Sequence, residues 1–464
     1  MMRSYEVLDT EENLVEAYLS DTIGRNVELN SFVELLTRID ENMSISIDGK
    51  WGSGKTFFVK QTQLIIDSHN PTAAMYDSEH GKQIRKQWEN YHKNTEEVFP
   101  AIVTVYYDAW SHDNDDDPLL SIIYEIMRSA SWGINPQNKK DWVEILAAVS
   151  DCIFDRGIAD LLKTVKGEDL FGKIKTQREV QEIISNYFES LLPEHGNSLV
   201  VFVDELDRCS PQYAVKVLER IKHYLNLPNV IFVFSINPEE LQHTIKKNYG
   251  DEFSAGRYLD RFFDLRVSIP PANMDKFIFS LGIGERRNLR ESICKEVIRM
   301  MGFELREISR YLPLAKHAAY KSTDSDHNQN RYIWSDDNGM SEFICLSVIL
   351  PIALGLKIYD SDEFTKFVEG KDGHWFFDVI NNDEHKDWVG RFMLADDESY
   401  GDIEGKTHVD YKNRVNDVYN AVFVRKYDNR NYQHKIGQAI FTADSKRSIL
   451  QAAGLLSKFT EYNL

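Results

Sequence analysis

Short runs of apolar residues that end in a polar residue recur through residues 43–271 of the chain. β-branched and aromatic side chains fill these runs, as is typical of buried strands, and amphipathic segments with helical spacing lie between them. Short strands that alternate with helices predict a parallel sheet in a three-layer α/β sandwich. The runs that we expect to form strands are Met43–Asp48, Ala101–Tyr107, Ser198–Glu205, Asn229–Asn237 and Leu265–Pro271.

The pattern changes after about residue 275, where helical spacing replaces the short apolar runs. The longest apolar run, 344–356, contains Pro351 and is too short to span a bilayer, so we expect a buried helix there. The chain is therefore expected to have two domains and one insertion. Their boundaries are 1–275 for the domain with the sheet, about 112–197 for a helical insertion within it, and 276–464 for a mainly helical C-terminal domain.

The first predicted strand continues into a glycine-rich loop. Residues Gly49–Thr56, GKWGSGKT, fit the phosphate-binding pattern G-x-x-x-x-G-K-[ST], and a helical pattern follows. Glycines let the backbone approach phosphate closely, and the N–H groups at a helix N-terminus hold anionic oxygens. We expect Lys55 to contact the β- and γ-phosphates and the Thr56 hydroxyl to bind Mg²⁺.

A second strand, Ser198–Glu205, ends in two carboxylates. Asp204 is expected to hold Mg²⁺ through a water molecule, and Glu205 to orient and deprotonate the attacking water. The alternative is a strand that ends in a solvated acidic turn. A phosphate-binding loop upstream, with one strand inserted between the two motifs, favours the catalytic interpretation and indicates hydrolysis. The nucleotide-binding residues that we expect are Gly49, Trp51, Gly52, Ser53, Gly54, Lys55, Thr56 and Asp204, with Thr56 and Asp204 as metal ligands.

One further polar residue and one acidic run each have two possible explanations. Asn237 ends a buried strand, where it would sense the γ-phosphate and the attacking water, or it caps the helix that follows. The acidic run Asp113–Asp117 has the oxygens of a Ca²⁺ loop, but it lacks the glycine and the terminal glutamate of an EF-hand. Asp117 as an N-cap, with Pro118 at the first helical position, explains the run better.

Composition narrows the class of protein. The net charge of −20 argues against a general nucleic-acid-binding surface, although it leaves room for a local basic groove. The four cysteines lie far apart, which indicates a reducing compartment without a disulfide framework or structural zinc. The N-terminus is polar and acidic, unlike a signal peptide. We therefore expect a cytoplasmic protein with no membrane association.

Several motifs together resemble the KAP family of P-loop NTPases. The phosphate-binding loop contains the family's Trp-Gly-Ser, and the other motifs follow it in the family's order. The resemblance covers residues 21 to about 315. The matching segments are Gly49–Thr56, Tyr106–Trp110, Val203–Cys209, Tyr258–Phe263 and Glu307–Tyr311.

The resemblance implies ATP hydrolysis, Mg²⁺ dependence and self-assembly into a homo-oligomer. It suggests that Arg261 reaches into a neighbour's site, so that the catalytic set is Glu205, Lys55, Asn237 and Arg261. Many bacterial relatives serve in defence against phage, which suggests such a role here, with a separate effector protein as partner.

The chain also departs from the family pattern. Asp108 stands where the family usually has Asn, and Glu205 stands where the second acid is often Asp. The paired transmembrane helices of some members are absent between residues 57 and 197, so membrane association is not implied.

Two functions fit these observations. The first is an ATPase that couples ATP binding and hydrolysis to self-assembly or to control of a partner. The alternative is a nucleotide-gated switch or scaffold with negligible turnover, in which ATP selects a conformation. The intact set of Lys55, Thr56, Asp204 and Glu205 favours the first.

Overall fold

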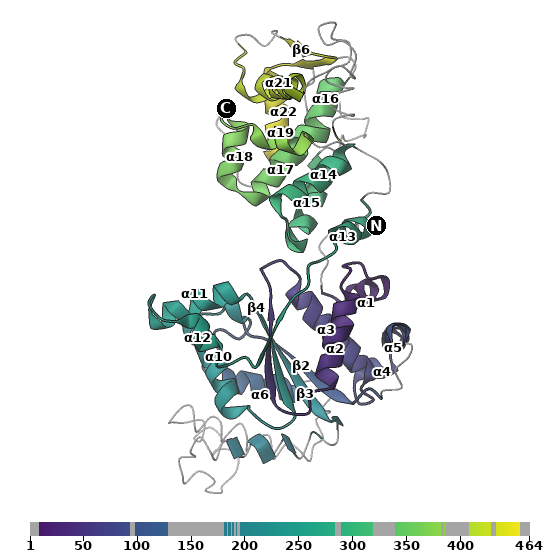
Figure 1. The fold of residues 1–464 in the computed structure, drawn as a ribbon, viewed down its shortest axis with the longest axis vertical. Coiled ribbons are helices and arrows are strands. Elements are labelled where there is room, and N and C mark those ends of the chain that lie inside the picture. Colours follow the sequence, from purple (N-terminus) through teal and green to yellow (C-terminus); the bar gives the residue numbers. More distant parts are fainter. Residues whose placement is uncertain are drawn as a thin grey trace, which may run out of the picture. The chain divides into compact units, whose positions relative to one another are not determined.

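The computed structural model divides the chain into two compact units, Leu8–Lys276 and a second unit that begins at Phe277 (Figure 1). Most of the expected insertion lies outside the described residues, as do residues 319–338 and 386–407. The residues that the structure describes are 9–92, 98–128, 196–283, 289–318, 339–381, 385, 408–427 and 433–454, with single positions between 181 and 195.

The first unit is built on a five-stranded sheet with the order β2-β3-β4-β1-β5. All neighbouring strands are parallel. The five predicted strands are therefore confirmed. In the sheet, β4 lies between the strand before the glycine-rich loop, β1, and the strand that ends in the acidic pair, β3. The strand bounds are β1 Met43–Asp48, β2 Ile102–Asp108, β3 Ser198–Asp204, β4 Val230–Ile236 and β5 Leu265–Ser268.

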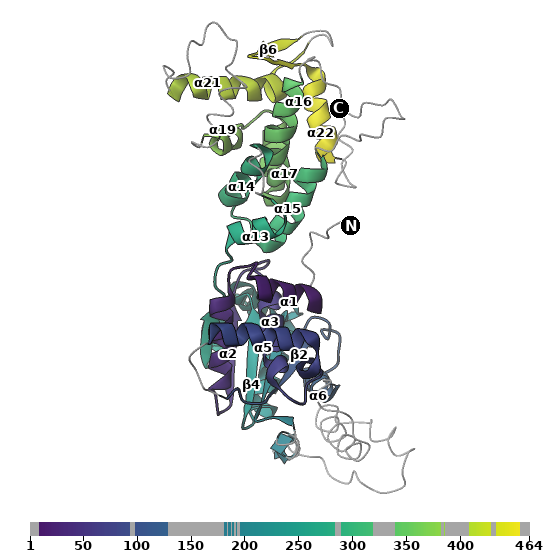
Figure 2. The same cartoon turned by 90° about the vertical axis from the view of Figure 1, so that its right-hand side faces the viewer.

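Helices cover both faces of the sheet, which confirms the three-layer α/β sandwich (Figures 1 and 2). Every residue of β3 and β4 is buried, because helices exclude water from both sides of these central strands. One face packs on α1 (Glu11–Ser20), α2 (Asn26–Thr37), α3 (Lys55–His69), α4 (Ala74–Asp77) and α5 (Glu79–Tyr91). The other packs on α6 (Pro118–Arg128), α10 (Pro211–Tyr224), α11 (Pro238–Tyr249) and α12 (Ala255–Leu259).

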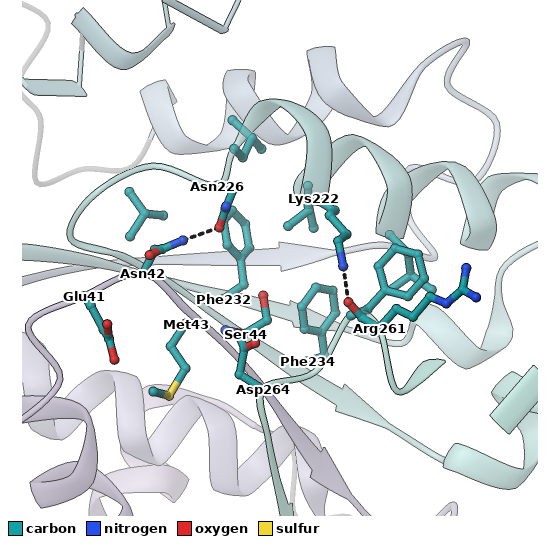
Figure 3. A pocket seen from close by; sticks show the side chains of 15 residues that line it. Glu41, Asn42, Met43, Ser44, Lys222, Asn226, Phe232, Phe234, Arg261 and Asp264 are labelled. Carbon is teal, nitrogen blue, oxygen red and sulfur yellow. Dashed lines mark hydrogen bonds between the residues drawn. The ribbon is translucent and has the colours of Figure 1, made fainter. Parts of the chain in front are cut away.

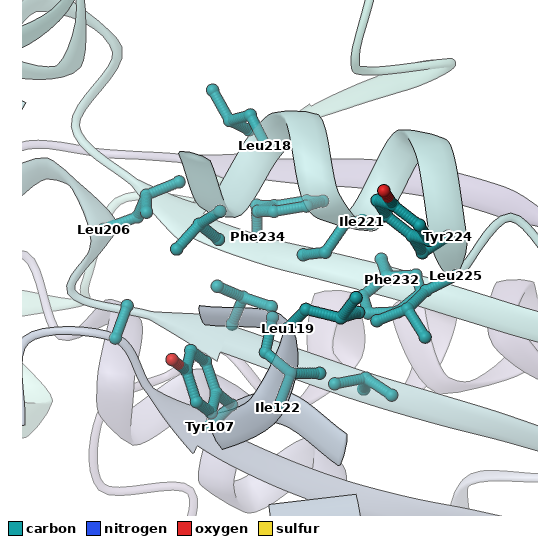
Figure 4. Close-up of a cluster of buried hydrophobic side chains, with 14 of the residues drawn as sticks. Tyr107, Leu119, Ile122, Leu206, Leu218, Ile221, Tyr224, Leu225, Phe232 and Phe234 are labelled. Atoms are coloured by element: carbon teal, nitrogen blue, oxygen red, sulfur yellow. The ribbon is translucent and has the colours of Figure 1, made fainter. Parts of the chain in front are cut away.

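The core under α6 and α10 is apolar and dense (Figure 4). Leu119 and Ile122 of α6 and Leu218 of α10 are completely buried, together with Phe232 and Phe234 of β4. This layer lies on the side of the sheet away from α3 and fixes the position of β3 and β4. The ends of these two strands carry Asp204 and Asn237, so the packing of this layer determines where both side chains stand.

Asp117 anchors the start of α6. Its Oδ1 accepts a hydrogen bond from the Leu119 N–H at 3.0 Å, so the N-cap prediction is confirmed. The same buried carboxylate accepts two bonds at its Oδ2 from Arg220 of α10, from Nε at 3.0 Å and from Nη2 at 2.7 Å. Asp117 thus joins two helices of one layer, and its role in the acidic run is structural.

The second unit is mainly helical, as expected, but it also contains a short antiparallel hairpin that the sequence pattern did not predict. Its helices are α14 (Leu289–Met301), α15 (Leu305–Ala318), α16 (Met340–Ile344), the π-helical turn η2 (Cys345–Ile349), α17 (Leu350–Tyr359), α18 (Ser361–Val368), α19 (His374–Ile380), α21 (His408–Tyr419), a second π-helical turn η5 (Asn420–Val424) and α22 (Ala443–Gly454). Helix α13 (Met274–Ser280) spans the boundary between the units, and the hairpin consists of β6 (His434–Ile436) and β7 (Ala439–Phe441).

One helix in the described part of the chain, Met340–Tyr359, is long and apolar enough to cross a membrane. It is longer than the predicted run, because η2 joins α16 to α17 without a break. However, 78% of its most apolar window is buried inside the protein, and the core helix of a water-soluble unit has the same length and composition. The burial agrees with the expectation of a buried helix.

Replacing Asp117 with alanine should lower the free energy of unfolding by about 2 to 4 kcal/mol, because the change removes a helix cap and one partner of an ion pair. The loss should lie toward the low end of the range for a buried pair, since the Arg220 side chain is 28% exposed. Chemical denaturation measures the change. Asp116→Ala, an exposed neighbour of the same type, should cost less than about 0.5 kcal/mol. Equal losses in the two variants would contradict the anchoring role.

Candidate nucleotide-binding site

The loop between β1 and α3 requires glycine at three positions. Gly52 and Gly54 have φ values of 84° and 87°, a region in which other residues are strained. At Gly49, a Cβ atom would lie 2.5 Å from Ile269 Cγ2 and 2.9 Å from Ser53 Oγ. The loop therefore owes its shape partly to backbone freedom and partly to a close approach by the chain after β5.

Side chains also hold the loop through hydrogen bonds, two of them belonging to loop residues and one to a residue outside the loop. Lys55 Nζ donates to the carbonyl oxygens of Gly49 at 2.8 Å and Lys50 at 3.1 Å. Ser53 Oγ donates to the Lys50 carbonyl at 2.8 Å. The buried Arg25, just before α2, donates from Nη1 to the Ser53 carbonyl at 2.8 Å. Cations therefore engage the loop carbonyls, which is the arrangement expected of a loop that offers its N–H groups to an anion.

The charge of Lys55 is set by burial and by nearby acids. Burial lowers the pKa of its ammonium group, while Asp207, Asp204 and Glu205 act in the opposite direction. The sheet register brings the glycine-rich loop to the acidic pair, because Asp48, just before the loop, and Asp204 lie opposite the neighbouring residues Ile236 and Ser235 of β4. The expected site, in which a lysine and two carboxylates surround the phosphates, stays a prediction.

Asp204 is almost completely buried, at 1% exposure, and both of its oxygens are engaged. Its Oδ1 accepts from the Glu205 N–H and its Oδ2 from the Tyr106 hydroxyl, each at 2.9 Å. Asp108 lies beside Asp204 in the register between β2 and β3, and its Oδ1 accepts from the Ser111 N–H at 3.1 Å. The Asn-to-Asp departure from the family pattern is therefore accommodated within a turn.

The metal-binding residues that we expected have suitable chemistry. Thr56, the second residue of α3, offers a hydroxyl oxygen, and Asp204 offers carboxylate oxygens at the same edge of the sheet. Mg²⁺ prefers such hard oxygen ligands, often through its bound waters. These residues therefore fit Mg²⁺, and their role as ligands stays a prediction.

Glu205 has an unusual backbone and a charged partner. Its φ of 61° lies in the left-handed region, which turns the chain sharply after β3 into the short helix η1 (Leu206–Arg208). Its carboxylate forms an ion pair with Arg208. Burial raises the pKa of Glu205, Asp204 adds to this increase, and Arg208 opposes it. The Arg208 guanidinium also lies over the Trp110 ring, 5.5 Å from its centroid.

Asp207 is a member of the site that the sequence analysis missed. Trp51 Nε1 in the loop donates to Asp207 Oδ2 at 2.5 Å. Asp207 is 6% exposed, and burial raises its pKa while Lys55 lowers it. It therefore connects the glycine-rich loop with η1. Its place two residues after the acidic pair was the available signal.

Asn237 forms the helix cap that we considered as its alternative role. Its Oδ1 accepts from the Glu239 N–H at 3.2 Å at the start of α11. The capping bond uses the oxygen of the carboxamide, and the residue is nearly buried at 9% exposure. The sensor role stays a prediction.

Arg261 lies at the end of the sheet where β1 begins, and the loop lies at the other end, where β1 finishes. Arg261 borders a cavity of about 390 Å³ with residues at the start of β1 and the end of α10 (Figure 3). Lys222 donates a hydrogen bond to its carbonyl oxygen. The six residues of β1 separate the two ends by about 20 Å. The structure therefore does not bring Arg261 together with the loop of its own chain.

Among the comparisons with known proteins, the family match falls mainly on the first unit. A sequence model described as the KAP family P-loop domain matches residues 25–290. No curated protein matches the chain. Two similar solved structures are the Aeropyrum pernix ORC2 protein in its ADPNP–ADP complexes (13% identity, 85% of this chain and 94% of that chain, TM-score 0.33) and C. elegans PCH-2 (11%, 82% and 71%, TM-score 0.19). Both TM-scores are too low to support an argument about function.

We expect the hydrogen bond between Trp51 and Asp207 to stabilise the loop. Trp51→Phe removes the donor and Asp207→Ala removes the acceptor, so each should lower the free energy of unfolding, and the double variant should lose less than the sum. The coupling should be about 1.5 to 3 kcal/mol, as for a hydrogen bond to a charged group. Chemical denaturation of the four proteins measures it.

The matched control replaces another tryptophan. Trp88 of α5 packs on His92 and Phe99, not on Asp207, so Trp88→Phe should be additive with Asp207→Ala. Additive losses for Trp51→Phe as well would show that the loop does not depend on this bond.

Proposed function

The chain belongs to the KAP family of P-loop domains, and from this premise we propose that it is a Mg²⁺-dependent ATPase. The cycle of ATP binding and hydrolysis would be coupled to self-assembly or to control of a partner protein. The family membership rests on a match over residues 25–290 of the 464-residue chain. A nucleotide-binding P-loop function follows from it directly, whereas hydrolysis and coupling are the proposal.

One observation carries the proposal: the sheet register places the start of the loop and the acidic pair at the same end of β4, where Asp48 lies opposite Ile236 and Asp204 opposite Ser235. A phosphate-binding lysine, a carboxylate with fixed orientation and a candidate base thus share one edge of the sheet. In this arrangement the loop N–H groups and Lys55 bind the phosphates. Thr56 and Asp204 would hold Mg²⁺, which neutralises charge on the β- and γ-phosphates when bound.

Glu205 would act as the general base. Its carboxylate accepts the proton of the attacking water, and its raised pKa suits a group that must hold that proton during the reaction. In the present structure the carboxylate is paired with Arg208. The pair uses Oε2, so Oε1 would be the oxygen that accepts the proton.

The Glu205–Arg208 ion pair is also the observation that favours the second candidate, a nucleotide-gated switch with negligible turnover. Pairing with an arginine stabilises the charged carboxylate and lowers its pKa, which makes Glu205 a weaker base. In this candidate, ATP would select a conformation or an oligomeric state, and release of the nucleotide would not require hydrolysis.

The role in anti-phage defence and the separate effector protein rest on the family resemblance alone.

Glu205→Gln should separate the two candidates. The variant keeps the shape of the side chain but cannot accept the proton, so phosphate release from ATP should fall by about 10² to 10⁴-fold while ATP binding is retained. Phosphate release and ATP affinity are measured for both proteins, and their size is determined with and without ATP and Mg²⁺. Glu28→Gln, at an exposed position on α2, is the control. Background turnover in the wild type, with a nucleotide-dependent change in size, would favour the switch.

A mixing experiment tests the proposed role of Arg261 in a neighbour's site. Arg261→Ala and Glu205→Gln should each be nearly inactive, since loss of an arginine finger costs about 10³ to 10⁵-fold. An equimolar mixture should regain activity, because some sites then combine an intact base with a neighbour's intact arginine. The control mixes Arg261→Ala with the double variant Arg261→Ala/Glu205→Gln, in which no chain supplies the arginine. Full activity of Arg261→Ala alone would contradict the role.

A further inference from the structure

Two consecutive tyrosines on β2 face opposite sides of the sheet. Tyr106 packs on the α3 side, and its hydroxyl donates to Asp204 Oδ2 at 2.9 Å. Tyr107 packs on the α6 side, where its hydroxyl is 2.6 Å from that of Tyr213 (Figure 4 shows Tyr107 in this layer). The two side chains have the same chemistry, but only the first touches a residue of the candidate site.

The Tyr106 hydroxyl engages one of the two oxygens of the Asp204 carboxylate. The Asp204 carboxylate stands at the end of β3, and the Glu205 N–H holds its Oδ1. A donor on Oδ2 as well defines the plane of the carboxylate. Each carboxylate oxygen has two lone-pair sites, so one hydrogen bond leaves a site for a metal ion or its bound water.

The ring of Tyr106 is in turn held by the helix that starts in the phosphate-binding loop. Lys60 Nζ of α3 lies 4.6 Å from the centroid of this ring, and the same ammonium group forms an ion pair with Asp9. A cation over an aromatic face is attracted by the negative face of the ring. The tyrosine thus lies between α3 and the acidic pair.

We propose that Tyr106 is a positioning residue, which orients the Asp204 carboxylate for the metal ion of the nucleotide site. The proposal rests on the proposed function, because it assigns Asp204 to that ion. Hydrogen bonds from the protein to a ligating carboxylate orient it, and their loss typically weakens metal affinity 10 to 100-fold. Tyr106 itself touches neither nucleotide nor metal in this role.

The test compares Tyr106→Phe with Tyr107→Phe in the full chain. Mn²⁺ serves as the probe, and its binding to the protein with ADP is measured by electron paramagnetic resonance. In Tyr106→Phe the dissociation constant of Mn²⁺ should rise about 10 to 100-fold. In Tyr107→Phe, which also loses a buried hydroxyl but on the other face, it should not change. ADP affinity in the presence of chelator should be the same in both variants and the wild type.

Further readouts separate positioning from general destabilisation. Excess Mg²⁺ should restore phosphate release in Tyr106→Phe, because the ligand remains and only its orientation is lost. An unchanged Mn²⁺ affinity in Tyr106→Phe, or an equal loss in both variants, would overturn the proposal.

If the wild type binds Mn²⁺ with ADP but releases no phosphate, hydrolysis fails as the proposed function. The ratio of the Mn²⁺ dissociation constants of the two variants still decides the role of Tyr106. No nucleotide-dependent Mn²⁺ binding in the wild type would overturn both.

Discussion

A lysine ammonium group and three carboxylates lie together at the carboxyl ends of the buried strands. The rest of the site depends on how far these opposite charges compensate for the cost of burying one another. Burial lowers the pKa of Lys55 and raises the pKa values of Glu205 and Asp207. Each opposite charge counteracts part of this effect, so no one of these charges is independent of the others. The site is consequently a coupled group, and the added negative charge of a nucleotide would shift the balance toward the charged lysine.

The phosphate-binding loop is shaped by residues far from it in the chain. Arg25 holds the Ser53 carbonyl from one side, and Asp207, 156 residues after Trp51, holds the loop from the other. Ile269 fills the space that a side chain at Gly49 would need. Three separate segments thus restrict the loop before any ligand arrives. A preorganised loop loses less conformational freedom on binding, so more of the interaction with phosphate contributes to affinity.

The sequence predicted those features that depend on local pattern. The buried runs gave the five strands, the glycines and Lys55 marked the loop, and Asp117 with Pro118 marked a helix start. The contacts from Trp51 to Asp207 and from Tyr106 to Asp204 could not be predicted. The two residues of each contact are 156 and 98 positions apart in the chain, and they meet only because of the order of the strands in the sheet. The hairpin of β6 and β7 was missed because strands of three residues are too short to show a period.

The position of Arg261 constrains how copies of the chain could assemble if this arginine completes a neighbour's site. The arginine lies with the start of β1, and the loop begins at its end, so the two groups occupy opposite edges of one sheet. A contact between Arg261 of one chain and the loop of the next then joins two different surfaces. Such a heterologous interface leaves a free loop on one chain and a free arginine on the other, so it repeats until it closes into a ring or continues as a filament. Hydrolysis at one interface would then change the contact on which the next chain depends, which is a direct physical route from ATP turnover to the state of the assembly.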